Sequence, residues 1–201
     1  MLKGDEMNTF QRQLAFGQIA ETEIAKWLLA RGAVVLPVYD IEYETGKGPR
    51  LFTGSGQLIA PDLLVWKKQI CWIEAKHKSV FTWHRKTMRW TTGIDKRHWH
   101  QYLKVRSLVD ISIWLLFLHR SESPDRRDLQ WDCPPRCPSG LFGGSLDRLE
   151  NCINHDVPAG NGGWGASGMV YWAHESLKKL ATVEEVIGES EIPLDREAKR
   201  N

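Results

Sequence analysis

The sequence has few cysteines and no long apolar run. Four cysteines among 201 residues do not make a disulfide scaffold. The longest apolar run, ISIWLLFL at residues 111 to 118, is much shorter than the roughly 20 residues needed to span a bilayer. The N-terminal MLKGDEMNTF has no apolar core of the kind found in signal peptides. We therefore expect a soluble cytoplasmic protein that does not associate with membranes.

An excess of one charge sign is also missing from the chain as a whole. The 27 basic and 25 acidic residues give a net charge of +2, which indicates no class of partner. Between Lys76 and Arg106, however, nine Lys or Arg residues face a single acid, Asp95, and aromatic residues are interleaved with them. This combination is typical of surfaces that bind nucleic acid phosphates and exposed bases. The alternative is a solvated positive face whose aromatic side chains turn inward.

The apolar periodicity predicts a mixed α/β protein in which helices pack on a sheet. We expect one domain over residues 1–201, with a core at about 10–120 plus 169–188 and a loop-rich elaboration at about 121–168. The expected elements are a helix over 9–31, a strand over 33–39, a loop or loose hairpin over 44–57, strands over 62–66 and 70–74, a helix over 94–109, a buried strand over 111–118, a short helix over 145–155, a strand over 169–172 and a helical segment over 175–188.

Two carboxylates and a lysine stand at the ends of the strands predicted over 62–66 and 70–74. Alternate side chains share a face of a strand, so Glu74 and Lys76 point the same way and the carbonyl of Ala75 lies between them. A tight turn places Asp62 beside them. Such an all-oxygen set suits Mg²⁺ or Mn²⁺, and a nearby ammonium can hold or help deprotonate a water, or stabilise charge on a phosphate. The chemistry indicated is attack by metal-activated water on a phosphodiester.

The pattern Pro61-Asp62, eleven residues, then Glu74-Ala75-Lys76 resembles the PD-(D/E)XK nuclease superfamily, which includes restriction endonucleases, Holliday junction resolvases and phage exonucleases. The resemblance implies a restriction endonuclease-like fold, a mixed β-sheet flanked by helices. It also implies that Asp62 and Glu74 are metal ligands, together with the Ala75 carbonyl, and that Lys76 is the catalytic lysine. Many members dimerise, so a homodimer is also expected, and a phage origin is compatible with the resemblance.

Further site residues follow from the same resemblance. Many members carry a glutamate on the first helix, where this chain offers Glu21 and Glu23. We favour Glu21, because small residues one turn away on either side let its carboxylate approach the sheet; two solvated acids are the alternative. Similar enzymes place a glutamine or tyrosine from the following helix near the phosphate, and the candidates here are His98, Gln101 and Tyr102.

The predicted function is a metal-dependent deoxyribonuclease that acts without sequence specificity or on a DNA structure. A non-cleaving nucleic-acid-binding module and an RNA-directed nuclease of the same fold are the alternatives. Arg85, Lys86 and Arg89 are expected to contact phosphates, and Trp83 and Trp90 to stack on bases. The full set of expected DNA-binding residues is Lys78, Trp83, Arg85, Lys86, Arg89, Lys96, Arg97, His98, Gln101 and Tyr102.

A second candidate site is built from cysteines and a histidine. Cys133 and Cys137 form one close pair, and Cys152 with His155 forms another, so together they could hold a structural zinc ion. Unpaired thiols in the core or in loops are the alternative that we favour. The glycine-rich stretches at 46–56 and 160–168 lack the Lys-Ser pair of a phosphate-binding loop and match no nucleotide-binding fingerprint.

Overall fold

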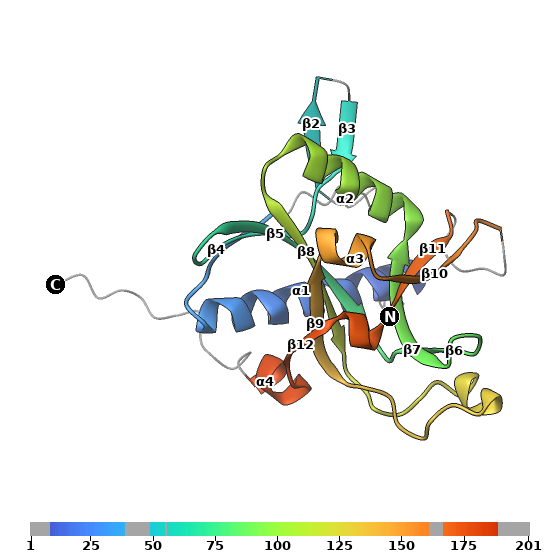
Figure 1. Ribbon diagram of the computed structural model, residues 1–201. Helices are drawn as coiled ribbons and strands as arrows, with labels where there is room; N and C mark the ends of the chain where they lie inside the picture. Colours follow the sequence, from blue (N-terminus) through green and yellow to red (C-terminus); the bar gives the residue numbers. More distant parts are fainter. Residues whose placement is uncertain (1–8, 39–48, 55, 161–166, 189–201) are drawn as a thin grey trace, which may run out of the picture.

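A six-stranded mixed sheet forms the centre of the molecule. The structure is a computed structural model, and it describes residues 9–38, 49–54, 56–160 and 167–188. The strand order is β1-β4-β5-β8-β9-β12 (Figure 1). Strands β5 and β8 are parallel, and every other neighbouring pair is antiparallel. The six strands are β1 (Val34–Pro37), β4 (Leu63–Trp66), β5 (Ile70–Lys78), β8 (Ser112–His119), β9 (Gly140–Ser145) and β12 (Lys178–Ala181).

Helices cover both faces of this sheet. Helix α1 (Thr9–Ala30) lies on one face, and α2 (Lys96–Leu108) and α3 (Leu146–Glu150) lie on the other (Figure 1). Ile24 and Trp27 of α1 pack with Ile73 of β5, whereas Tyr102 of α2 packs in a separate cluster with Trp72 of β5. The mixed sheet flanked by helices is therefore confirmed. In the described ranges, no helix is long and apolar enough to cross a membrane.

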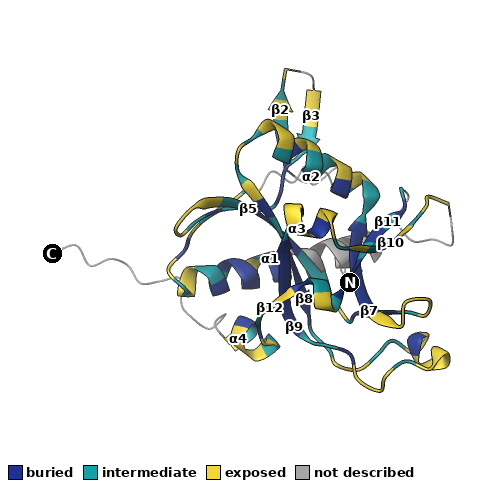
Figure 2. Cartoon of the chain, viewed as in Figure 1, coloured by how far each residue is buried: buried dark blue, intermediate teal, exposed yellow. Residues whose placement is uncertain are grey.

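Alternation along the central strands produces these two faces. In β5, Ile73 and Ala75 pack on the α1 side, and Trp72 packs on the α2 side. Because side chains alternate along a strand, Glu74 and Lys76 also point to the α2 side. Strand β8 is buried along most of its length, as Figure 2 shows. A strand buried on both faces reads as a continuous apolar run, which is why ISIWLLFL was recognisable in the sequence.

A second sheet packs on the α2 side in the order β10-β11-β7-β6. Its core contacts are made by Trp83, Trp90 and Trp172. Strand β7 runs directly into α2, because Asp95 ends β7 and caps α2 by accepting the backbone N–H of Arg97 at 2.8 Å. The strands are β6 (Thr82–His84), β7 (Arg89–Asp95), β10 (Ile153–Val157) and β11 (Met169–Ala173), and a separate hairpin joins β2 (Arg50–Thr53) to β3 (Gly56–Ile59).

Most elements predicted over residues 9–120 are confirmed, and the later ones differ more. The segment 175–188 is not one helix: it holds the 3-10 helix η2 (His174–Ser176), strand β12 and helix α4 (Val183–Ile187). The region expected to be rich in loops holds the 3-10 helix η1 (Asp128–Trp131) and two strands, β9 and β10. Residues 39–48 lie outside the described residues, so part of the predicted loop over 44–57 is not described.

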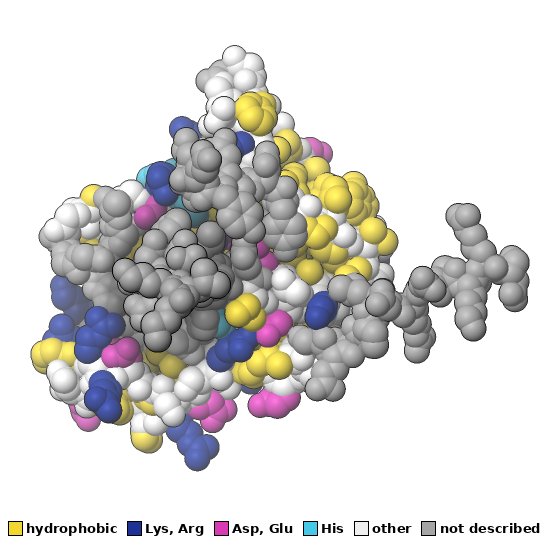
Figure 3. All heavy atoms as spheres, turned by 180° about the vertical axis from the view of Figure 1, so that it is seen from behind, with side chains coloured by type: hydrophobic (Ala, Val, Ile, Leu, Met, Phe, Trp, Pro, Cys, Tyr) yellow, Lys and Arg dark blue, Asp and Glu magenta, His cyan; other side chains and the backbone are white. Residues whose placement is uncertain are grey.

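The two sides of the molecule differ in the character of their surfaces. Edge strand β1 exposes Val34 and Leu36, and hydrophobic side chains gather on the upper right of the view in Figure 3. Basic side chains gather on the opposite, lower left side of that view, on the side where the β6–β7 hairpin lies.

Candidate active site

The candidate site lies where β4 begins beside the middle of β5. Leu63 pairs with Ile73, so Asp62 lies just beyond the paired region and next to Glu74. One carboxylate oxygen of Asp62, Oδ2, accepts a hydrogen bond from the backbone N–H of Ala75 at 2.8 Å. In a strand, the N–H and C=O of one residue point to the same side. The Ala75 carbonyl therefore points to the same edge of β5 as the Asp62 carboxylate.

Glu74 and Lys76 form an ion pair on the α2 face of β5. The Glu74 side chain is 2% exposed, whereas that of Lys76 is 26% exposed and reaches solvent. Oε2 of Glu74 is buried and has no hydrogen-bond partner among the described residues. A buried carboxylate oxygen without a donor is costly, so this oxygen is suited to receive a further cation or donor.

The electrostatics of the site are those of crowded acids around one ammonium. Burial and then the Glu74 carboxylate raise the pKa of Asp62 well above its usual range. Burial, with a smaller contribution from Glu74, also raises the pKa of Glu21, against the opposing effect of Lys76. Burial by itself lowers the pKa of Lys76, but Glu74 and Asp62 outweigh it and raise the pKa above its usual value. Lys76 is therefore firmly protonated at neutral pH.

The two acids of α1 have different surroundings. Glu21 interacts electrostatically with Lys76 and Glu74, which places its carboxylate at the site. Glu23 is buried and forms an ion pair with Arg120, just after β8. Glu23 therefore has a partner away from the site, and Glu21 stays the favoured candidate on α1.

Helix α2 brings two of its three predicted residues to the site. Tyr102 is buried, and burial followed by the nearby Glu74 and Asp62 charges raises its pKa well above its usual value. The His98 ring stands 6.0 Å from that of Tyr102, and burial and then Lys76 lower its pKa. Gln101 faces elsewhere, because its Oε1 accepts the backbone N–H of Ile59 at 3.2 Å. Gln101 therefore holds the β2–β3 hairpin against α2.

The residues present fit a hard divalent cation. Asp62, Glu74 and the Ala75 carbonyl supply oxygen ligands at one edge of β5, and Glu74 has an oxygen with no donor among the described residues. In the described segments, no three His, Cys, Asp or Glu side chains group closely enough to hold a metal ion by themselves, at this site or elsewhere. Mg²⁺ needs no such group, since it is usually held through one or two carboxylates and keeps several waters.

The second candidate site does not come together as a ligand cluster. Among the described residues, Cys133, Cys137, Cys152 and His155 form no group of three or more ligating side chains. Cys137 is buried, and its Sγ donates to the carbonyl of Ser121 at 3.3 Å. His155 is stacked between His84, at 3.6 Å, and Tyr171, at 4.6 Å. All four cysteines are free thiols, the alternative that the sequence favoured.

The basic segment after β5 forms the β6–β7 hairpin. Arg85, Lys86 and Arg89 are exposed on it, as phosphate-binding residues must be. The prediction that Trp83 and Trp90 stack on bases is wrong, since both are buried and pack edge to face at 5.0 Å. Among the other expected contacts, Lys96 forms an ion pair with Asp156 and Arg97 is exposed.

One exposed aromatic residue escaped the sequence analysis. Trp131 of η1 is 47% exposed and carries the Arg85 guanidinium over its ring at 3.8 Å. It lies outside the basic segment in sequence, so no local pattern connected the two residues.

Comparisons with known proteins give distant structural likenesses. No family model matches the chain, and no curated protein matches it. A Holliday junction resolvase from the archaeal hyperthermophile Archaeoglobus fulgidus is similar with 8% identity and a TM-score of 0.43, covering 80% of this chain and 90% of the resolvase. A nuclease from a fusselovirus is similar with 13% identity and a TM-score of 0.37, covering 92% of this chain and 95% of that one. Likenesses this distant leave the function to be argued from the site.

Proposed function

We propose that this chain is a Mg²⁺- or Mn²⁺-dependent deoxyribonuclease that hydrolyses phosphodiester bonds without sequence specificity or on a particular DNA structure. The observation that carries the proposal is the buried Glu74, which is ion-paired to Lys76 and stands beside Asp62 with one oxygen lacking a donor. A purely structural ion pair would have no need of a second, destabilised carboxylate, Asp62, at the same place.

Each residue has a role that follows from its surroundings. Asp62, Glu74 and the Ala75 carbonyl would hold the cation, which when bound supplies charge stabilisation and an activated water. The Ala75 N–H fixes the orientation of the Asp62 carboxylate. Glu21 would add negative charge from α1; its pKa is raised by burial first and by Glu74 to a smaller extent.

Lys76 acts as a cation rather than as a base. Its pKa is raised by Glu74 and Asp62, so it keeps its proton at neutral pH. A protonated ammonium at the mouth of the site can donate to a phosphate oxygen and stabilise the charge that develops there. Tyr102, held protonated by burial and by Glu74, orients the Glu74 carboxylate from the α2 side.

The test is a cleavage assay on a panel of labelled duplex, forked, nicked and single-stranded DNA and the matching RNA, with Mg²⁺, Mn²⁺ or EDTA. Cleavage of DNA with either metal and none in EDTA supports the proposal. Cleavage of RNA alone would favour the RNA-directed alternative. Tight binding with no cleavage under any condition would favour a binding module of the same fold.

A further inference from the structure

A cavity begins at Lys78 of β5, two residues beyond Lys76 of the candidate active site. It has a volume of about 480 Å³, within the range of small-ligand pockets. Its walls come from the end of β5, the β6–β7 hairpin, β11 and residues 125–131 around η1, and we call it the hairpin pocket. Its lining includes Lys78, Thr82, Arg85, Asp125, Asp128 and Trp131.

Lys78 connects the hairpin pocket to the site. It lies two residues beyond Lys76 on β5, so both side chains leave the same face of the strand. The pKa of Lys78 is lowered to about 8 by burial and then by the charge of Lys76, so the two ammonium groups feel each other. An anion in the pocket would relieve that repulsion, and the next phosphate along a bound strand is such an anion.

Two cationic side chains of the hairpin pocket, Lys78 and Arg85, have no acidic partner among the described residues. Asp128 accepts the backbone N–H of Trp83 at 3.0 Å, and Asp125 accepts from the backbone and side chain of Arg127. Neither Lys78 nor Arg85 takes part in an ion pair with any described residue. The acids of the pocket are thus engaged within its own wall, and the cations are available to a ligand.

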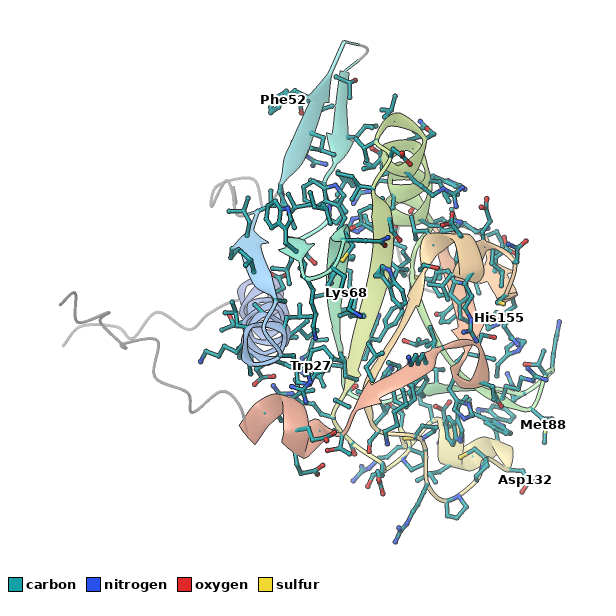
Figure 4. The ribbon with its side chains drawn as sticks, turned by 60° about the vertical axis from the view of Figure 1, so that its left-hand side comes forward. Trp27, Phe52, Lys68, Met88, Asp132 and His155 are labelled. Carbon is teal, nitrogen blue, oxygen red and sulfur yellow. The ribbon has the colours of Figure 1, made fainter. Side chains whose placement is uncertain are left out.

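An aromatic platform stands at the opposite wall. The Arg85 guanidinium lies over the Trp131 ring at 3.8 Å, and Trp131 remains 47% exposed. Figure 4 shows that Met88, at the tip of the hairpin, and Asp132, next to Trp131, lie on the same side of the molecule, far from Phe52 on the β2–β3 hairpin. An indole with a stacked guanidinium is a surface on which a nucleobase face can lie.

A base offers its face to such a platform only when it is unpaired, because in a duplex both faces are covered by neighbouring bases. We propose that the hairpin pocket binds one unpaired nucleotide of the DNA substrate, with Lys78 on its phosphate and the Arg85–Trp131 pair against its base. This inference rests on the proposed function, and it names the substrate class: DNA with a single-stranded segment beside the cut.

Beyond Arg85, a second cavity of about 670 Å³ shares Thr82, Trp83, Arg85 and Tyr171 with the hairpin pocket. Along its side runs a stack of three rings, His84, His155 and Tyr171, with centroid spacings of 3.6 and 4.6 Å. The two cavities are therefore neighbours with these four residues in common, and a strand that leaves the duplex would meet the second after the first.

The experiment measures binding without cleavage, in EDTA and in an Asp62→Asn background. Fluorescence anisotropy compares a labelled duplex, the same duplex with a single-stranded flap, and the flap strand alone. Trp131→Ala should weaken binding of the flapped and single-stranded DNA about 5- to 150-fold, the range for loss of one stacked base, and change duplex binding less than twofold. Trp131→Phe should restore most of the loss, because a phenyl ring can still stack.

The matched control is Leu129→Ala, which truncates another exposed side chain of η1. It should leave all three affinities unchanged. Lys78→Met should lower the magnitude of the salt slope for the flapped substrate by about one unit. Equal weakening of duplex and flapped DNA by Trp131→Ala, or no weakening of either, overturns the inference.

The two proposals fail in different ways. A wild-type protein that cuts DNA with Mg²⁺ while Trp131→Ala binds all substrates normally refutes the pocket alone. A wild-type protein that prefers flapped DNA through Trp131 but never cuts refutes the nuclease alone. If the wild-type protein binds none of the DNA probes, both are refuted.

Discussion

The carboxylate of Asp62 and the backbone N–H of Ala75 are joined by a 2.8 Å hydrogen bond between the start of β4 and the middle of β5. This bond fixes one acid against the strand that carries Glu74 and Lys76. In Asp62→Asn, the amide oxygen can still accept the Ala75 N–H. This substitution therefore removes the charge of Asp62 and keeps its hydrogen bond.

Three substitutions test catalysis directly. Asp62→Asn, Glu74→Gln and Lys76→Ala should each lower the cleavage rate in Mg²⁺ by about 100-fold or more, since each removes a charge from the reacting centre. Rates are measured on the best substrate of the panel, and circular dichroism confirms that each variant is folded. Wild-type rates in two of the three would show that the site is elsewhere.

The two acids of α1 form a matched pair for a second prediction. Glu21→Gln should lower the cleavage rate about 10-fold or more, because it removes a carboxylate that interacts with Lys76 and Glu74. Glu23→Gln should leave the rate near that of the wild type and lower thermal stability, because Glu23 pairs with Arg120. The reverse pattern of rates would assign the role to Glu23 instead.

Removal of Asp62 should not weaken DNA binding in EDTA. Glu74 and Asp62 are close enough for each to raise the cost of the other's charge, and without a cation both repel phosphate. Asp62→Ala should therefore bind duplex DNA at least as tightly as wild type in EDTA, as measured by anisotropy. Clearly weaker metal-free binding by this variant would contradict an acid pair beside the phosphate.

The raised pKa of Asp62 predicts a dependence of stability on pH. The folded protein holds the Asp62 proton to a higher pH than the unfolded chain, whose Asp pKa is about 3.9, so the unfolding free energy falls as pH rises from that value through the raised pKa. Above the raised pKa, Asp62 is charged in the folded protein and the full loss of unfolding free energy is present. At pH 7 in EDTA, Asp62→Asn should therefore be more stable than wild type, by about 0.5–2 kcal/mol.

The measurement is the Tm of both proteins across the acid and neutral range in EDTA. Their difference should grow with pH and then level off. A difference that is constant with pH would mean that the Asp62 charge carries no penalty in the folded state.

On duplex DNA, where no base face is open to Arg85, the exposed cations of the β6–β7 hairpin should contribute through phosphates alone. A triple variant, Arg85→Ala with Lys86→Ala and Arg89→Ala, should lower the magnitude of the salt slope of DNA binding by about three units, with similar weakening across sequences. Titrations at several salt concentrations give the slope. An unchanged slope would move the DNA path away from this hairpin.

The sequence carried enough information to predict the central strands and the acid–acid–lysine set. Asp62, Glu74 and Lys76 were recognisable because strand alternation and a short turn alone bring them together. The choice between Glu21 and Glu23 needed the structure, since it depends on how α1 is rotated over the sheet and on Arg120, about a hundred residues away.

Other features were hidden by local composition. Strand β9 fell within the region predicted to be rich in loops, and it contains three glycines. A Cβ on Gly143 would stand 2.4 Å from Leu116 Cδ2 and 3.1 Å from the Leu115 carbonyl oxygen. The close packing of β9 on β8 therefore requires glycine at this position. Strand β12 was hidden among helix-forming residues, although Thr182 and Glu185 make a capping box that marks the true start of α4. Trp83 faces inward from a strand of three residues, too short for alternation to be read.

The direct passage of β7 into α2 at Asp95 has a mechanical consequence. No linker separates the hairpin that lines the pocket from the helix that carries Tyr102, and Lys76 and Lys78 stand on one strand about 6.6 Å apart along its axis. These connections fix the distance between the hairpin pocket, where a base would be held, and the Asp62–Glu74–Lys76 site, where a bond would be cut. The cut would then fall at a constant offset from the junction between paired and unpaired DNA.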